Sequence, residues 1–399
     1  MVIRIALISD AFPPMRTSAA IQLRDLAQEF LHQGFTPTML VPSSEIDKPW
    51  LLEDVDGVEV LRLKAPKTKD VSYVRRTAAE FLMPFFMIYN LRKSPLGNTK
   101  WNGVVWYSPT IFLGPIVKAL KNKSSCKSYL IIRDIFPEWA ANVGLISRGL
   151  AYRFFKAVEK YQYSVADAIG VQSSGELNYF SNWVSKYGRR VEVLHNWIAK
   201  TSNVGCSISV ANSSLAGRII FVYAGNIGVA RGMDTLIDFV DRMKPRSDVG
   251  FLFVGRGSEM TRLSDEAKKR KLDNILFYNE IDPSEISGLY SQCHVGIIAL
   301  DPRHNTQNIP GKFLTYMQAG LPVLASINPG NDLVDLINIE KIGRVCTDCS
   351  VDTLEKLAIE LLTEISTTSY FKYRCQNLSN RLYEPSIAVE KILKSIINA

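Results

Sequence analysis

The chain has 399 residues, of which 47% are hydrophobic and 22% are charged; this is enough for two hydrophobic cores, because single cores stop growing near about 250–300 residues. The composition excludes disordered, fibrous and small disulfide-stabilised secreted proteins. No apolar run reaches the roughly 18 residues of a membrane-spanning helix, so integral membrane proteins are excluded as well.

Short runs rich in Val, Ile and Leu alternate with helical patterns along the chain. This alternation predicts βαβ units and parallel sheets that are buried on both faces. In the first half we expect strands at Ile3–Ile8, Thr36–Leu40, Val58–Leu61, Gly103–Trp106, Tyr129–Ile132, Ala168–Gln172 and Val191–Leu194. In the second half we expect them at Ile219–Tyr223, Gly250–Val254, Ile275–Tyr278, Val295–Ile298, Pro322–Ala325 and Gly343–Val345. The Ser- and Asn-rich stretch Thr201–Gly217 is predicted to be the linker.

The net charge of +8 belongs entirely to the first half of the chain. Residues 62–133 carry 14 basic side chains and only two acidic ones, Asp70 and Glu80. Such a region predicts an anionic partner, which can be a membrane surface, nucleic acid or a phosphorylated substrate. Six scattered cysteines and an N-terminus that resembles a strand favour a reducing compartment and a cytoplasmic protein.

Glycine-rich turns or helix starts follow three of the strands predicted in the second half. The first contains Gly225, Asn226 and Gly228, with Arg231 close behind, and the second contains Arg256. The third is a helix start that runs from Asn308 through Pro310 and Gly311 to Lys312. Glycines let a ligand approach the backbone, and a helix N-terminus attracts anions. Together these features predict a site for a diphosphate.

The motifs resemble those of retaining, Leloir-type glycosyltransferases of family 4. The similar segments are YAGNIGVARG at 223–232, VGRG at 254–257, PGKFLTYMQAG at 310–320, FPP at 12–14, RDIFPE at 133–138 and HNW at 195–197. The last two resemble a bacterial subgroup that transfers fucose-type and N-acetyl amino sugars, such as N-acetylfucosamine, in O-antigen and capsule synthesis.

This resemblance implies an α/β protein of the GT-B fold, in which two Rossmann-like domains with parallel sheets face a central cleft. Residues 1–199 plus 383–399 would bind the acceptor, and residues 200–382 would bind the nucleotide sugar. The implied reaction moves an N-acetylated hexose or 6-deoxyhexose, with retention and without a required metal, from a UDP-sugar to a lipid-diphosphate-linked saccharide in bacterial surface polysaccharide synthesis.

The resemblance also implies roles for individual residues. Arg231 and Lys312 would stabilise the leaving diphosphate, and Arg133 stands where the family has a catalytic-region histidine. Gln307 and Thr315 occupy the places of two glutamates that bind the sugar and the ribose, and Asn226 occupies the place of an arginine. The remaining residues expected near the donor are Gly225, Gly228, Arg256, Asn308, Pro310 and Gly311.

The acceptor side is expected to include two carboxylates and a loop. Asp134 and Glu138 are candidates for taking the proton of the acceptor hydroxyl, although a helix cap and a surface charge explain them as well. The acceptor loop is predicted to contain Pro14, Arg16 and Ser18.

An aromatic segment with basic flanks is predicted to lie on an anionic membrane surface, on the inner face of the cytoplasmic membrane. Its contacts would be Arg75, Arg76, Phe85, Arg92 and Lys93. A core helix with solvated ends explains the same residues.

Three other functions compete with a glycosyltransferase: a non-hydrolysing UDP-sugar epimerase of the same architecture, a two-domain binding protein and a nucleic-acid binder. We expect no nucleic-acid partner, because no recognised nucleic-acid module occurs in the basic region. Asp54 and Asp56 form a D-x-D string that we predict to be a solvated loop. Cys346 and Cys349 lack the second cysteine pair of a zinc site and are predicted to form a turn.

Overall fold

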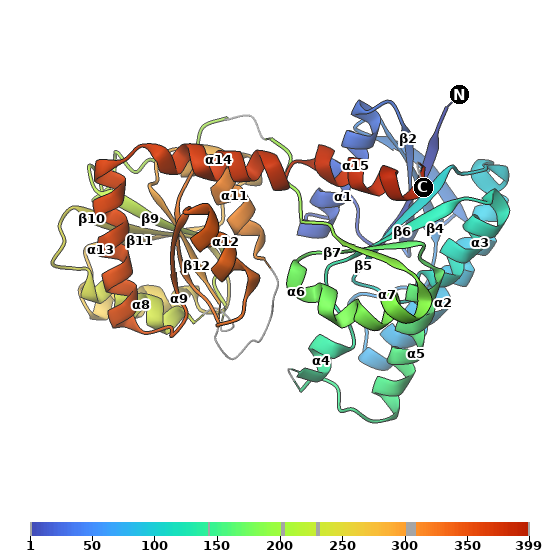
Figure 1. Ribbon diagram of the computed structural model, residues 1–399, viewed down its shortest axis with the longest axis horizontal. Coiled ribbons are helices and arrows are strands. Elements are labelled where there is room, and N and C mark those ends of the chain that lie inside the picture. Colours follow the sequence, from blue (N-terminus) through green and yellow to red (C-terminus); the bar gives the residue numbers. More distant parts are fainter. Residues whose placement is uncertain (1, 143, 201–203, 229–231, 301–308, 398–399) are drawn as a thin grey trace. The chain divides into compact units, whose positions relative to one another are not determined.

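The computed structural model describes residues 2–142, 144–200, 204–228, 232–300 and 309–397, which form two compact units (Figure 1). The first unit comprises Met1–Trp197 and Pro385–Ala399, and the second comprises Ile198–Glu384. The second unit is two residues longer at each end than the predicted donor domain. Its two terminal segments are joined to each other, because the Ile198 N–H donates to the Tyr383 carbonyl at 2.9 Å and Lys200 pairs with Glu384 at 2.7 Å.

The first unit is built on an eight-stranded sheet with the order β3-β4-β2-β1-β5-β6-β7-β8. The strands are β1 (Arg4–Ile8), β2 (Thr36–Ser43), β3 (Trp50–Val55), β4 (Val58–Lys64), β5 (Gly103–Ser108), β6 (Lys127–Ile132), β7 (Ala168–Val171) and β8 (Arg190–Val193). All neighbours are parallel except β3, which is antiparallel to β4. The seven predicted strands are confirmed, and β3 is an edge strand that the sequence analysis missed.

Helices cover both faces of this sheet. Ile5 and Leu7 of β1 pack in one core with α1 (Ser18–His32) and α15 (Pro385–Ile396), which lie beside each other (Figure 1). Ala6 and Ile8 pack in the opposite core, which receives side chains from α2 (Tyr73–Lys93), α3 (Gly114–Ser124) and α5 (Leu150–Val165). The remaining short helices are α4 (Glu138–Asn142), α6 (Ser174–Leu177), α7 (Ser181–Tyr187), η1 (Pro95–Asn98) and η2 (Asn178–Phe180).

The second unit contains a six-stranded parallel sheet with the order β11-β10-β9-β12-β13-β14. Its strands are β9 (Ile219–Asn226), β10 (Val249–Arg256), β11 (Ile275–Asn279), β12 (Val295–Ala299), β13 (Val323–Ser326) and β14 (Gly343–Cys346). One core contains α8 (Met233–Arg242), α9 (Met260–Lys269) and α13 (Val351–Thr367). The other contains α10 (Ile286–Tyr290), α11 (Gly311–Ala319), α12 (Asp332–Glu340) and α14 (Tyr370–Leu382), with η4 (Pro283–Glu285) beside α10.

The predicted linker is more than a connection, because its second part belongs to the core of the second unit. Ile208, Val210 and Leu215 are buried there. The Gln292 side chain accepts the Val210 N–H at 2.9 Å and donates to the Ile208 carbonyl at 2.9 Å. The segment is polar overall but contains three buried apolar residues, so the prediction of a linker was wrong for residues 208–215.

Both units are layered α/β structures, which confirms the predicted fold class. Their strands bury apolar residues on both faces, as expected for parallel sheets covered by helices. Within the described residues, every helix is too short or too polar to cross a bilayer.

Candidate active site

The second unit has its topological switch point between β9 and β12. The strand β9 pairs with β10 on one side and with β12 on the other. The chain therefore runs from β9 through β10 to β11 on one side and then crosses to β12 on the other side of β9. In open α/β sheets a crevice forms outside the carboxyl ends of such strands, and ligands bind there. Gly225 and Asn226 occupy this edge and are exposed.

Lys312 projects from the start of α11 toward the end of β9. Its Nζ lies 3.2 Å from the centroid of the Tyr223 ring. A Cβ added to Gly225 would lie 3.7 Å from the Cε and Nζ of Lys312, and Gly225 has φ +128°. A glycine here therefore fits both the backbone conformation and the approach of the lysine.

The helix α11 is held against β9 by a buried tyrosine in its second turn. The Tyr316 hydroxyl accepts the Ala224 N–H at 3.3 Å and donates to the Val222 carbonyl at 3.0 Å. The helix begins at Gly311 after Pro310, which provides no side-chain cap. Free backbone N–H groups and the positive end of the helix dipole therefore accompany Lys312 at this edge.

The turns after β9 and β10 pack backbone against backbone. A Cβ on Gly255 would lie 1.9 Å from the Gly225 carbonyl oxygen, and one on Gly257 would lie 2.1 Å from the Ile227 oxygen. No side chain fits at either place. The second glycine-rich turn thus supports the first by packing against it, and its role in binding phosphate stays a prediction.

Four of the predicted donor residues have neighbours within the unit. Arg256 is exposed and forms an ion pair with Glu280, with Nε 3.2 Å from Oε2. The Thr315 hydroxyl donates to the Lys312 carbonyl at 2.8 Å. Gly228 lies beside the Asn226 side chain. Arg231, Gln307 and Asn308 lie outside the described residues.

The first unit has its switch point between β1 and β5, since β1 pairs with β2 on one side and with β5 on the other. Asp10 follows β1 at this edge. Its Oδ1 is buried and has no hydrogen-bond partner among the described residues. Burial raises the pKa of Asp10, and the positive charges of Lys69 and Arg76 oppose that rise. No motif in the sequence singled out Asp10, although its position directly after the first strand is a usable indication.

The beginning of α2 lies against this crevice. The Arg76 Nε is 2.7 Å from Glu80 Oε1, and the pKa of Glu80 is raised by burial, with Asp10 adding to the rise. Arg76, which was predicted to contact the membrane, is thus paired and close to Asp10.

Arg133 is buried, with 6% of its surface exposed. It donates to the Leu194 carbonyl at 2.9 Å and lies 4.9 Å from the centroid of the Trp197 ring. Burial lowers its pKa. The neighbouring Glu176 is also buried, and burial raises its pKa to about 7. Arg133, which follows β6, is therefore hydrogen-bonded to the residue that follows β8.

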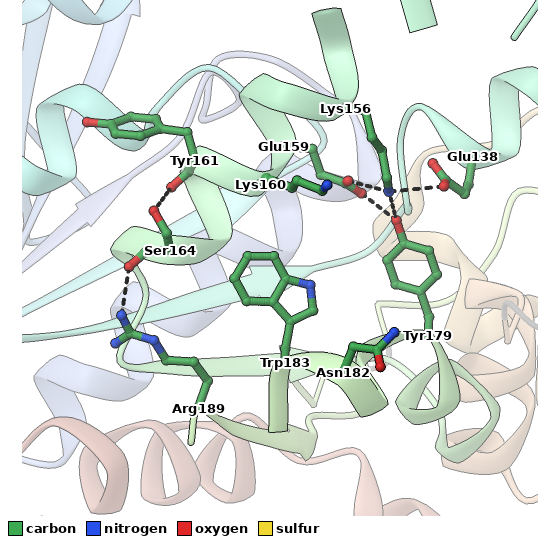
Figure 2. Close-up of a pocket in the computed structure, with 10 residues that line it drawn as sticks. All are labelled: Glu138, Lys156, Glu159, Lys160, Tyr161, Ser164, Tyr179, Asn182, Trp183 and Arg189. Atoms are coloured by element: carbon green, nitrogen blue, oxygen red, sulfur yellow. Dashed lines mark hydrogen bonds and ion pairs between the residues drawn. The ribbon is translucent and has the colours of Figure 1, made fainter. Parts of the chain in front are cut away.

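The two predicted carboxylates have different neighbours. Asp134 is exposed after β6. Glu138 begins α4 and turns toward α5, where its Oε1 is 3.0 Å from Lys156 Nζ and accepts the Tyr152 hydroxyl at 2.7 Å. Figure 2 shows Glu138 pointing at Lys156. Glu138 thus belongs to an ion-pair network on α5.

The predicted acceptor loop is exposed at Pro14, Arg16 and Ser18. Ser18 is the first residue of α1, and Thr17 caps the helix by accepting the Ala20 N–H at 3.3 Å. The Pro13 carbonyl accepts a hydrogen bond from Arg62 at 2.6 Å. The loop is therefore held at its base while these three side chains remain accessible.

The predicted membrane segment is a helix with one buried face and one exposed apolar face, and its contact with a membrane stays a prediction. The helix α2 continues through Pro84 and buries one face, including Met83 and Met87. Its other face exposes aromatic and aliphatic side chains: Tyr73, Val74, Phe81, Leu82, Phe85, Phe86 and Tyr89. Arg75, Arg92 and Lys93 are exposed as well. The apolar surface continues onto α5, because the Phe81 and Phe154 ring centroids are 6.2 Å apart.

Comparisons with known proteins agree with the geometry of the second unit. Residues 218–364 match the family model described as glycosyl transferases group 1. The chain is 22% identical over 249 residues to the probable glycosyltransferase WbjE of Pseudomonas aeruginosa, covering 59% of this chain and 60% of WbjE. It is 24% identical over 305 residues to the putative colanic acid biosynthesis glycosyl transferase WcaI of Escherichia coli (strain K12), covering 74% of this chain and 72% of WcaI.

A solved structure resembles nearly the whole chain. Anabaena Alr3699/HepE in complex with UDP and glucose has a TM-score of 0.67 at 13% identity, covering 98% of this chain and 99% of that chain. The comparisons favour a glycosyltransferase over the epimerase. Together, the comparisons show that residues 218–364 match the glycosyl transferases group 1 model, that two glycosyltransferases are similar in sequence, and that nearly the whole chain shares the GT-B fold of HepE.

Proposed function

We propose that the chain is a retaining family 4 glycosyltransferase that moves a sugar from UDP to a lipid-diphosphate-linked saccharide in bacterial surface polysaccharide synthesis. The observation that carries this proposal is the approach of Lys312 to Gly225 at the switch point of the second unit. The name of WcaI, which refers to colanic acid biosynthesis, and the UDP complex of HepE support the pathway class and the nucleotide.

The leaving group is a nucleoside diphosphate, on which negative charge increases as the glycosidic bond breaks. Preorganised cations and backbone N–H groups stabilise such charge most when they are in place before the reaction. Lys312 and the N-terminus of α11 provide both at the edge of β9. Arg231 would add a second cation, and Gly225 leaves room for the phosphates. This account requires no metal cofactor.

The acceptor is proposed to bind at the crevice of the first unit. Its hydroxyl oxygen forms the new bond to the anomeric carbon on the face that the diphosphate leaves, so the configuration is retained. The hydroxyl proton passes to a phosphate oxygen of the leaving group or to a carboxylate. Asp10 is the candidate carboxylate, because its Oδ1 lacks a hydrogen-bond partner among the described residues and burial raises its pKa. Asp134 is a second, exposed candidate.

The sugar is proposed to be an N-acetylated hexose or a 6-deoxyhexose, on the resemblance of residues 133–138 to the fucose-type subgroup. A thermal-shift series with UDP-, GDP- and dTDP-linked sugars tests the donor, because a ligand that binds only the folded chain raises its melting temperature. We expect the largest shift with a UDP-linked sugar of these classes. No shift with any of the nucleotide sugars would overturn the proposed function.

The acceptor's lipid is proposed to hold the enzyme peripherally on the inner face of the cytoplasmic membrane. The exposed face of α2 provides aromatic side chains, of which Phe85 is 48% exposed, next to Arg75, Arg92 and Lys93. Each basic residue near an anionic surface contributes about 1 kcal/mol. Arg76 is left out of this set, because it pairs with Glu80.

Sedimentation with phosphatidylglycerol vesicles at low salt tests this placement. Neutralising Arg75, Arg92 and Lys93 together should release most of the bound protein. The control variant neutralises three exposed lysines of the second unit, Lys244, Lys268 and Lys269, and should sediment as the unaltered chain does. Equal retention of both variants, or no retention of the unaltered chain, would refute the membrane proposal.

A further inference from the structure

Outside both crevices, the first unit contains a cavity of about 780 Å³ beside α5 (Figure 2). We call it the α5 pocket. Its walls come from α4 and α5 on one side and from the segment η2–α7 and Arg189 on the other. The lining residues are Glu138, Lys156, Glu159, Lys160, Tyr161, Ser164, Tyr179, Asn182, Trp183 and Arg189.

One end of the α5 pocket is a closed network of acids, a lysine and a tyrosine. Lys156 Nζ lies 3.0 Å from Glu138 and 2.5 Å from Glu159. The Tyr179 hydroxyl donates to Glu159 at 2.8 Å, and Tyr163 donates to the same carboxylate at 3.1 Å. Lys156 therefore balances one of the two carboxylates, tyrosine hydroxyls donate to both of them, and the network fixes that wall.

Outside the network, the lining carries two further positive charges, on Lys160 and Arg189. Lys160 is exposed and forms no ion pair within the described part of the chain. Arg189 donates to the Ser164 carbonyl at 3.1 Å, and its nearest carboxylate, Asp167, is 4.0 Å away. Both cations belong to the pocket lining; Figure 2 shows Arg189 reaching Ser164 and the Lys160 amine on the side of Trp183 that faces the network.

An indole lies between the two ends (Figure 2). Trp183 is half-buried, and its ring meets that of Tyr163 edge-to-face with centroids 5.6 Å apart. The packing against Tyr163 orients the indole. Asn182, next to it in the chain, lines the pocket with an amide that can donate and accept hydrogen bonds.

We propose that the α5 pocket binds a saccharide residue that carries an anionic group, either a carboxylate or a phosphate. Its volume is in the range of small-molecule sites. A sugar ring has an apolar face that an indole can cover and hydroxyls that Asn182 can bind. Lys160 and Arg189 would hold the anionic group through charge-assisted hydrogen bonds. A neutral sugar lacks a partner for these two cations.

The pocket also indicates what such a residue belongs to. Glu138, at the end that holds the network, begins the helix that follows β6 and the candidate acceptor residue Asp134. A saccharide chain bound at the crevice of the first unit could thus continue into the α5 pocket with a distal residue. This purpose rests on the proposed function, whereas the binding of an anionic sugar does not.

Fluorine NMR of the full chain labelled with 5-fluorotryptophan tests the binding directly. Trp183→Phe assigns the resonance of Trp183. The probes are D-glucuronic acid, α-D-glucose 1-phosphate and D-glucose, each titrated into the millimolar range. We expect the Trp183 resonance to shift saturably with at least one of the two anionic sugars and not with glucose. The anion that binds more tightly identifies the group.

Two variants and a control complete the test. Lys160→Ala and Arg189→Ala should each weaken binding of the anionic sugar about tenfold, the effect of losing one charge-assisted hydrogen bond. Lys244→Ala, which removes an exposed lysine of the second unit, should leave it unchanged. No shift of Trp183 with either anionic sugar, an equal shift with glucose, or unaltered binding by both pocket variants would overturn the proposal. None of these results depends on donor binding or transfer, so they are distinguishable from a failure of the proposed function.

Discussion

Replacing Lys312 by methionine removes one charge from the crevice of the second unit and keeps a side chain of similar length. In the structure the Nζ of Lys312 is within 3.2 Å of the Tyr223 centroid and faces the edge at Gly225. If it binds a phosphate of UDP, the loss of one charge-assisted hydrogen bond weakens binding by about 2 kcal/mol, or about thirtyfold in Kd.

Stability should change much less than affinity. The variant loses a cation–π contact of about 2 kcal/mol, but it also removes the cost of holding an ammonium group against a buried ring. Isothermal titration with UDP measures the affinity, and thermal unfolding measures the stability. Lys244→Met is the matched control. An unchanged Kd for UDP in Lys312→Met would refute the phosphate role, and a large fall in melting temperature with unchanged Kd would identify the lysine as structural.

Three further predictions concern single residues of the two units. Asp10→Asn should lower transfer at least about 100-fold, the contribution of a general base, and leave the Kd for UDP unchanged. In the unaltered chain, transfer should rise with pH as the carboxyl of Asp10, whose pKa is raised, loses its proton. Full activity of the variant would exclude this role. The pKa of Glu176 is about 7 in the folded chain, against an ordinary value of 4.5, so the folded state binds this proton more tightly than the unfolded state. The free energy of unfolding should therefore fall by roughly 3 kcal/mol as the pH rises from about 4.5 to 7. Urea unfolding should show a weaker fall for Glu176→Gln, and an identical dependence of stability on pH in both chains would contradict the raised pKa. Gly255→Ala should destabilise the second unit strongly, because the added Cβ would lie 1.9 Å from the Gly225 carbonyl oxygen. The control is Gly311→Ala, whose added Cβ has no atom within 4 Å. Equal melting temperatures of the two variants would contradict the packing of Gly255 against Gly225.

The sequence was a good guide to the sheets, because parallel strands covered on both faces are continuous apolar runs. Strand β3 escaped prediction because it is an edge strand whose Glu53 and Asp54 face solvent or partners outside the core. Its D-x-D string ends in a hairpin turn, where Asp54 accepts the Gly57 N–H at 2.8 Å. The anchors of the predicted linker escaped because Ile208, Val210 and Leu215 are separated by polar residues.

Local motifs were enough to predict that Gly225 lies at a strand end and Lys312 at a helix start. Contacts between distant segments were not predictable. The sequence places Arg133 next to Asp134 and gives no indication that its guanidinium reaches the Leu194 carbonyl. Likewise, the spacing of Glu138 does not reveal its ion pair with Lys156, which depends on how α4 and α5 pack.

The donor's diphosphate is proposed to bind to the second unit at the carboxyl edge of β9. A crystal structure of the full chain grown with UDP tests this most directly. The account predicts the diphosphate against the backbone at Gly225 and the first turn of α11, within hydrogen-bond distance of the Lys312 Nζ. UDP bound elsewhere on the chain, or bound at this edge with its phosphates turned away from Lys312, would contradict it.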